Sequence, residues 1–151
     1  MAGAVCCGLI PHLELALHPE LYGQSVVVAR FGDRVITASQ QAAAHGVLPG
    51  MTLRQAEALS PAVAVVEPQP EAARRLQERI AAALYDLAPV VEVRLDGHAW
   101  LDLDGIPCVG QAVKEARHRL RDGGRVEPRL GMAPGPSLRP WPPLAPSRAG
   151  C

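Results

Sequence analysis

Residues 95–105, Leu-Asp-Gly-His-Ala-Trp-Leu-Asp-Leu-Asp-Gly, decide the fold more than any other stretch of this 151-residue chain. An Asp-Gly pair favours the tight turn that joins two antiparallel strands, because glycine adopts positive φ without a steric cost. Residues 91–94 before the pair and 99–103 after it are mostly apolar, as strands are. The stretch therefore predicts a β-hairpin that turns at Asp96-Gly97.

Amphipathic helices are predicted on both sides of this hairpin. Residues 70–87 begin with a proline, which suits a first helical turn, and Pro89 ends the segment. Apolar residues recur there at intervals of three and four, so that one face of the helix is apolar. A second helix is predicted at 109–120, ended by Gly123-Gly124, and a short strand at 129–132.

The N-terminal part of the chain predicts shorter elements. Residues 4–10 form an apolar run that favours a buried first strand. Residues 25–30 and 34–37 are β-branched runs on either side of Phe31-Gly32-Asp33, which predicts a second hairpin. A further short strand is predicted at 63–66.

Two short helices are predicted between these strands. Ser39 is a suitable N-cap for an alanine-rich helix that stops at Gly46. Thr52 opens another helix that stops before Pro61.

The order of elements predicts an α+β fold: a mixed sheet with packed helices, and a small lobe inserted after the first strand. We expect one region at 1–133, with the inserted lobe at about 12–70. Six prolines fall in the last nineteen residues. Because such a segment cannot bury much apolar surface, 134–151 is predicted to be a disordered tail.

Composition limits the function. Fifteen basic residues balance fifteen acidic ones, which argues against a strong general nucleic-acid binder. The four cysteines are not at zinc-ligand spacings, so no metal or other cofactor is expected. No apolar stretch reaches the ~20 residues that cross a membrane, and the start lacks the basic region of a secretory signal, so we expect a cytoplasmic protein.

Four segments, in this order, resemble motifs of the Y-family (UmuC/DinB-like) translesion DNA polymerases. Residues 18–28, HPELYGQSVVV, are similar to N-P-x-L-x-G-x-P-V-V-V. Residues 35–51 are similar to V-x-T-A-S-Y-E-A-R-x-x-G-V-x-x-G-M, and residues 87–92 to F-S-P-x-V-E. Residues 100–105 are similar to F-L-D-L-T-G. The resemblance implies that the sheet and long helices form a palm and that the insert is the fingers.

The resemblance also implies carboxylates that hold two divalent cations for nucleotidyl transfer. This sequence has Val5 on the first strand, and Gly97 and His98 in the hairpin, where that family has acids. Asp96 supplies one carboxylate if Gly97 is an insertion. The family's tyrosine and arginine that contact the triphosphate are replaced by Gln40 and Ala43, so those contacts are expected to be lost.

These departures are similar to those of the non-catalytic ImuB-like branch, whose members act with a RecA-like partner and a separate error-prone polymerase. We therefore predict an ImuB-like UmuC-domain protein of DNA repair, translesion synthesis and SOS mutagenesis, in the form of a truncated remnant. It is predicted not to be an enzyme, to have no catalytic, nucleotide-binding or metal residues, and to contact DNA weakly. The alternatives are an active polymerase fragment and a protein-interaction module without DNA contact.

Simpler interpretations compete for individual residues. His98 is expected to be an exposed turn histidine rather than a metal ligand, and Asp96 a residue that stabilises the turn. Cys6-Cys7 suits a buried strand better than a nucleophile, since no base is placed beside it. Residues 102–105 resemble part of a calcium loop, but the remaining ligand positions carry no carboxylates, so a strand end is expected.

Overall fold

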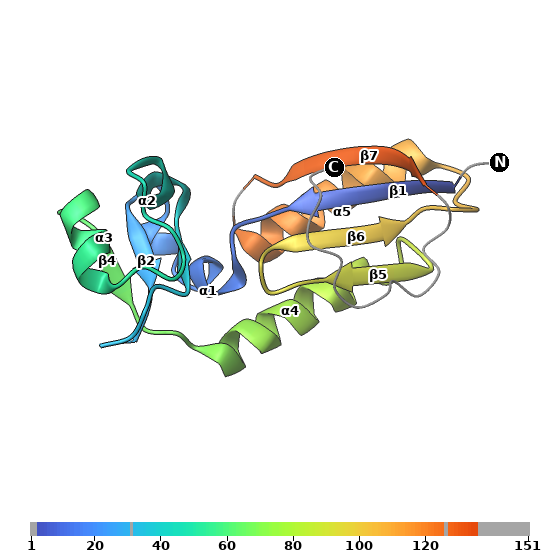
Figure 1. Cartoon of the computed structure of the whole chain (residues 1–151). Coiled ribbons are helices and arrows are strands. Elements are labelled where there is room, and N and C mark those ends of the chain that lie inside the picture. Colours follow the sequence, from blue (N-terminus) through green and yellow to red (C-terminus); the bar gives the residue numbers. More distant parts are fainter. Residues whose placement is uncertain (1–2, 31, 126, 136–151) are drawn as a thin grey trace. The chain divides into compact units, whose positions relative to one another are not determined.

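The computed structural model describes residues 3–30, 32–125 and 127–135. The chain divides into two compact units (Figure 1). The first unit joins the residues up to Ile10 to those from Arg75 onward, and the second is Pro11–Arg74. No helix in the described part of the chain is both long enough and apolar enough to span a bilayer.

The first unit is built on a four-stranded sheet in the order β5-β6-β1-β7. Every pair of neighbours in this sheet is antiparallel. The strands are β1 (Gly3–Leu9), β5 (Val90–Val93), β6 (His98–Asp102) and β7 (Arg129–Gly135). The first strand thus lies between two strands from the far part of the chain, which makes this sheet dependent on long-range pairing.

The predicted hairpin is confirmed, and its turn explains the Asp-Gly pair. The Arg94 amide donates to the His98 carbonyl at 2.8 Å, and the Gly97 amide donates to the Arg94 carbonyl at 3.1 Å. Gly97 has φ +94°, a conformation that other residues rarely adopt. Asp96 accepts a hydrogen bond from the His98 amide at 3.1 Å. Asp96 therefore stabilises the turn, as expected from its side chain.

Two helices, α4 (Pro70–Leu84) and α5 (Val109–Gly124), pack on the same face of this sheet (Figure 1). Their apolar faces supply buried residues to the core of the unit, as the periodicity predicted. The largest of these residues are Ile80 and Leu84 from α4 and Leu120 from α5. From the sheet, Cys6, Ala99 and Leu101 are fully buried. Cys6 therefore behaves as a small apolar core residue.

The ends of the two helices differ from the prediction. Helix α4 ends at Leu84, and a turn follows in which the Leu87 amide donates to the Leu84 carbonyl. Helix α5 continues through Gly124 and ends at Arg125, which has φ +54°. The glycines therefore lie in the last turn of α5. The missing side chain of Gly123 lets Ile80 of α4 approach closely.

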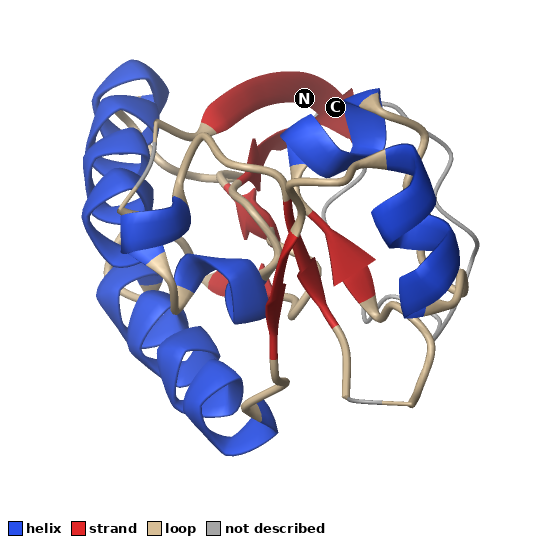
Figure 2. Cartoon of the chain, turned by 90° about the vertical axis from the view of Figure 1, so that its left-hand side faces the viewer, coloured by secondary structure: helices blue, strands red, loops and turns tan. Residues whose placement is uncertain are grey.

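The second unit contains a three-stranded sheet in the order β3-β2-β4. Its strands are β2 (Val26–Val28), β3 (Thr37–Ala38) and β4 (Ala64–Val66). Because β2 pairs antiparallel with β3 and parallel with β4, this smaller sheet is the mixed one. The helices are α1 (Leu13–Ala16), the 3-10 helix η1 (Pro19–Leu21), α2 (Gln40–Ala44) and α3 (Leu53–Leu59). Figure 2 shows helices and strands throughout the chain, which confirms the α+β class.

The short helices begin where the sequence predicted. The Ser39 hydroxyl accepts from the Ala42 amide at 3.2 Å and so caps α2. Thr52 and Gln55 form a reciprocal capping box at the start of α3. The small apolar core of this unit lies between these helices and the strands, and its buried members are Val27, Val35, Ala42, Val47 and Ala56.

The second strand of the smaller hairpin was predicted at 34–37 but lies at Thr37–Ala38. Residues 34 and 35 pair instead with the segment that precedes α3, while the Ile36 amide donates to the Val28 carbonyl of β2 at 2.8 Å. The Val35 amide donates to the Met51 carbonyl at 2.8 Å, and the Gly50 amide donates to the Val35 carbonyl at 2.7 Å. This pairing satisfies the backbone of a buried valine, which outweighs the local β-preference for a tight hairpin.

The last predicted strand is longer than expected, since β7 runs from Arg129 to Gly135. The tail was predicted from residue 134. Residues 136–151 lie outside the described part of the chain, so the prediction of a disordered tail stays a prediction.

Candidate functional site

One face of the four-stranded sheet is turned away from α4 and α5, and we call it the front face. Residues alternate between the two faces of a strand, and paired residues on neighbouring strands share a face. A side chain at Gly8 would meet Leu120 of α5, so Gly8 marks the opposite, helix-covered face. The front face therefore carries alternate residues in register: Leu9 opposite His98, Cys7 opposite Trp100, and Val5 opposite Asp102.

Four residues of the β5–β6 hairpin form what we call the hairpin cluster: Arg94, Asp96, His98 and Trp100. Asp96 lies between two basic side chains, with its Oδ2 3.3 Å from Arg94 Nη2 and its Oδ1 3.1 Å from His98 Nδ1. The His98 ring is stacked on the Trp100 indole at 5.3 Å between centroids, with an interplanar angle of 11°. The Arg94 guanidinium carbon lies 5.8 Å from the Trp100 ring centroid. The indole is thus held by two neighbours.

The charges of this region are fixed by its hydrogen bonds. Partial burial by itself raises the pKa of Asp96. The hydrogen bond from the His98 amide, together with the nearby His98 ring and the Arg94 charge, outweighs it and lowers the pKa below its ordinary value. Asp96 is therefore ionised at neutral pH and holds Arg94 and His98 in place.

Two further charges lie on the front face near the hairpin cluster. Glu92 of β5 is opposite Trp100, and Arg129 of β7 is opposite Leu9, which is itself opposite His98. One row across the sheet therefore combines His98, Leu9 and Arg129. The adjacent row includes Glu92, so the face carries both signs of charge.

The register of the sheet places Val5, where the family resemblance expects an acid, on the first strand but away from the hairpin turn. Val5 lies opposite Asp102 and is two front-face rows away from His98. The residue that lies opposite His98 is Leu9. The Gly97 carbonyl, at the turn, accepts from the Ile10 amide at 2.9 Å, which fixes the end of β1 against the hairpin. No acid occurs anywhere in the sequence of β1, GAVCCGL.

The front face does not fit the pair of divalent cations that a Y-family resemblance implies. Such cations need several oxygen ligands that converge on one point. Asp102 is only 4% exposed, and its Oδ1 accepts from the Asp104 amide at 3.0 Å. Among the residues that the structure describes, no group of three or more His, Cys, Asp or Glu side chains could hold a metal ion.

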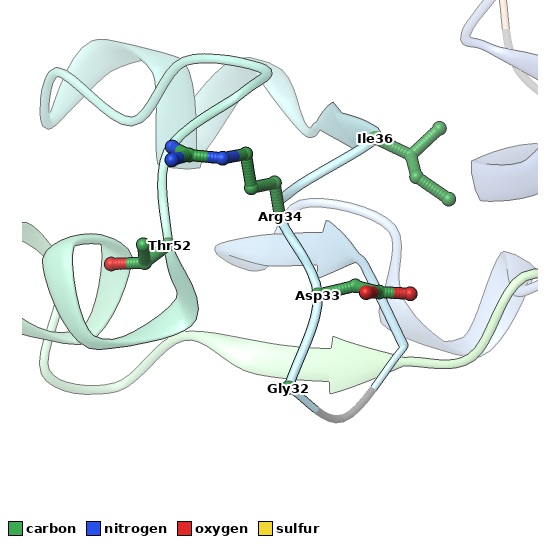
Figure 3. A pocket seen from close by; sticks show the side chains of 5 residues that line it. All are labelled: Gly32, Asp33, Arg34, Ile36 and Thr52. Atoms are coloured by element: carbon green, nitrogen blue, oxygen red, sulfur yellow. The ribbon is translucent and has the colours of Figure 1, made fainter.

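In the second unit, Gln40 and Ala43 both lie exposed on α2, where the resemblance expected triphosphate contacts. A pocket of about 560 Å³ lies elsewhere in this unit, lined by Gly32, Asp33, Arg34, Ile36 and Thr52 (Figure 3). Arg34 donates to the Gly50 carbonyl at 2.7 Å. No sequence motif indicated this pocket, because its lining comes from the predicted turn, from the irregular segment that follows it, and from Thr52.

An antiparallel four-stranded sheet with two helices on one face, and a small α/β unit inserted after its first strand, is the palm-and-fingers arrangement of DNA polymerases. The chain belongs to the impB/mucB/samB family, whose sequence model matches residues 11–138. Its sequence and fold correspond to the N-terminal region of the Y-family polymerases, as the sequence motifs predicted.

Curated relatives agree with this family. The chain is 36% identical to DNA polymerase IV of Streptomyces coelicolor over 106 residues, which are 69% of this chain and 21% of that protein. It is 31% identical to DNA polymerase IV of Pseudomonas paraeruginosa over 133 residues, which are 83% of this chain and 38% of that protein. The chain thus spans well under half the length of these relatives.

Solved structures agree with the fold. DinB from Sulfolobus solfataricus superposes with a TM-score of 0.72 at 22% identity, over 87% of this chain and 42% of that one. A ternary complex of Dbh gives a TM-score of 0.71 at 23% identity, over 87% of this chain and 41% of that one.

The prediction that the chain is not an enzyme is wrong. It rested on the residue types at three expected acid positions, Val5, Gly97 and His98. The relatives that match most of the chain are named as DNA polymerase IV, which is an enzyme.

Proposed function

We propose that this chain acts in DNA repair by translesion synthesis, as the palm and fingers of a Y-family polymerase. The observation that carries the proposal is the family match over residues 11–138, which includes parts of both units. The palm-and-fingers fold and the polymerase names of the relatives support it. The ligand would be primer–template DNA, and in bacteria such as these relatives the place of action would be the cytoplasm.

A DNA-binding titration tests this proposal. Fluorescence anisotropy with a labelled primer–template should show binding. The logarithm of the binding constant should fall linearly with the logarithm of the salt concentration, because each phosphate contact releases counterions. The balance of charges on the chain predicts a shallow slope. A chain that does not bind DNA even at low salt would contradict the proposal and favour a protein-interaction module.

One observation favours a second candidate, an ImuB-like role in SOS mutagenesis in which the chain recruits other repair proteins. That observation is the poor fit of the front face, within the described residues, to two divalent cations. The partners would be a RecA-like protein and an error-prone polymerase. Primer extension separates the two roles. Extension by the chain alone supports the polymerase role, whereas extension that needs the added polymerase, together with co-elution of the two proteins, supports recruitment.

A further inference from the structure

The hairpin cluster combines an aromatic ring with an exposed arginine and a half-buried histidine. The side chain of Arg94 is 46% exposed and that of His98 is 36% exposed. Their positions are fixed, because Asp96 contacts both and Trp100 packs against both. A site whose groups are already ordered loses little conformational entropy when a ligand binds.

The chemistry of these groups matches an unpaired nucleotide. The flat face of an indole stacks on a base, and a guanidinium offers five N–H donors to phosphate oxygens. Because the His98 ring is stacked on one face of Trp100, a base would stack on the other face. Arg94 contacts Asp96 through one terminal nitrogen, Nη2, at 3.3 Å. The rest of its donors can therefore point to a phosphate without breaking the turn. Arg129, across the same face, supplies a second cation for the backbone of the strand.

The anions of the face set a limit on affinity. Asp96 is paired with Arg94, so its charge is compensated within the hairpin cluster. Glu92 is exposed and lies opposite Trp100, where it would repel a nearby phosphate. Removing the charge of Glu92 should therefore strengthen DNA binding, whereas removing the charge of Arg94 should weaken it.

We propose that the hairpin cluster binds single-stranded DNA directly, through the Trp100 ring and the Arg94 guanidinium, without a divalent cation between the protein and the DNA. This inference rests on the proposed function, which makes DNA the ligand. It adds the contact residues, which are set by the ordered ring and the guanidinium group of the hairpin cluster.

The primary experiment measures binding of labelled single-stranded DNA of about 12 nucleotides, within the usual site size of such proteins. Anisotropy titrations are run in EDTA and in Mg²⁺ at equal ionic strength. The two dissociation constants should agree within about twofold, since no contact needs the metal. A Trp141→Phe background leaves Trp100 as the single tryptophan, and its fluorescence should be quenched as a base stacks on the ring.

Matched variants locate the contact. Arg94→Gln should weaken binding about fivefold or more, in the range of single stacking and charge contacts. Arg117→Gln is the control, because Arg117 is 54% exposed, pairs with the carboxylate of Glu127, and lies on α5. It should change binding less than about twofold, as expected for a charge outside the contact. Trp100→Leu should abolish the quenching and weaken binding about fivefold or more, while Glu92→Gln should tighten it.

The outcomes separate this inference from the function it rests on. If the chain binds neither single-stranded DNA nor primer–template, the proposed function fails and the inference fails with it. If DNA binds but requires Mg²⁺, or if Arg94→Gln and Arg117→Gln weaken binding equally, the inference alone is overturned. Thermal denaturation of each variant shows whether the fold is kept. If Trp100→Leu unfolds, Arg94→Gln still tests the inference, because it is a conservative change of an exposed side chain.

Discussion

Gly97→Asp should destabilise the first unit, although it places a carboxylate in the hairpin where the Y-family resemblance expects one. Gly97 is buried and has φ +94°. It forms the turn through its amide to Arg94, and its carbonyl accepts from Ile10 at the end of β1. An aspartate there must either adopt a strained conformation or shift the backbone that makes these two bonds. Either change also moves His98, which begins the next strand.

The size of the effect follows from the backbone. A side chain in the left-handed region costs roughly 1–2 kcal/mol. For a unit of this size a loss of 1 kcal/mol lowers the melting temperature by about 4–8 °C, so a decrease of about 4–16 °C is expected. Gly110→Asp is the matched control. Gly110 lies in the first turn of α5 with open space where a Cβ would be, and an acid at a helix N-terminus gains about 0.3–1 kcal/mol.

The assay is thermal denaturation followed by circular dichroism, with and without Mg²⁺. The same substitution should lower the melting temperature at Gly97 and raise it slightly at Gly110. Mg²⁺ should not recover the loss at Gly97, because a ligand stabilises only in proportion to its binding to the folded state. A Gly97→Asp protein as stable as the parent, or one that Mg²⁺ restores fully, would refute the reasoning.

Three further substitutions test the packing, the capping and the electrostatics. Gly123→Ala should lower the melting temperature, because its Cβ would lie 2.8 Å from Ile80 Cγ1. Overpacking of this kind costs about 1–3 kcal/mol, whereas alanine in place of glycine stabilises a helix by at most about 1 kcal/mol. A higher melting temperature would show that Ile80 moves freely. Ser39→Ala should cost the second unit about 1–2 kcal/mol in urea denaturation, since the hydroxyl caps α2 at Ala42; an unchanged midpoint would contradict this. Because the pKa of Asp96 is lowered in the folded state, its contribution to stability is full above the ordinary aspartate value of 3.8 and is lost as the pH falls below it. In Asp96→Asn, the free energy of unfolding should therefore depend less on pH below that value.

Local signals predicted most of the fold because they act through neighbouring residues. The Asp96-Gly97 turn, the Ser39 cap and the Thr52 capping box each depend on contacts a few residues away. The strand predicted at 34–37 was wrong for the opposite reason. Its first two residues, Arg34 and Val35, pair with residues 50–52, and sequence periodicity carries no information about such a distant partner.

The candidate site was harder to predict because it depends on register. The pairing of β1 with β6 joins residues from distant parts of the chain and puts Leu9 opposite His98 and Val5 opposite Asp102. A count along the sequence cannot fix this pairing, since a shift of one residue turns every side chain to the other face. The hairpin cluster also escaped prediction as a unit. Arg94 and Trp100 were assigned separately to strands, and only the three-dimensional hairpin brings them together.

The two faces of the sheet in the first unit are under different structural constraints. Ala99 and Leu101 point toward the helices and are fully buried, so the packing of the core constrains them. The buried side chains of Ala99 and Leu101 stabilise the fold, whether or not the protein is catalytic. His98 and Trp100 alternate with them on the same strand but lie on the front face, where packing constrains them far less. Membership of the family therefore does not determine how the front face would bind DNA. Because the residues there include an ordered ring and two guanidinium groups, the dependence of DNA binding on Mg²⁺ is the measurement that links the fold to its function.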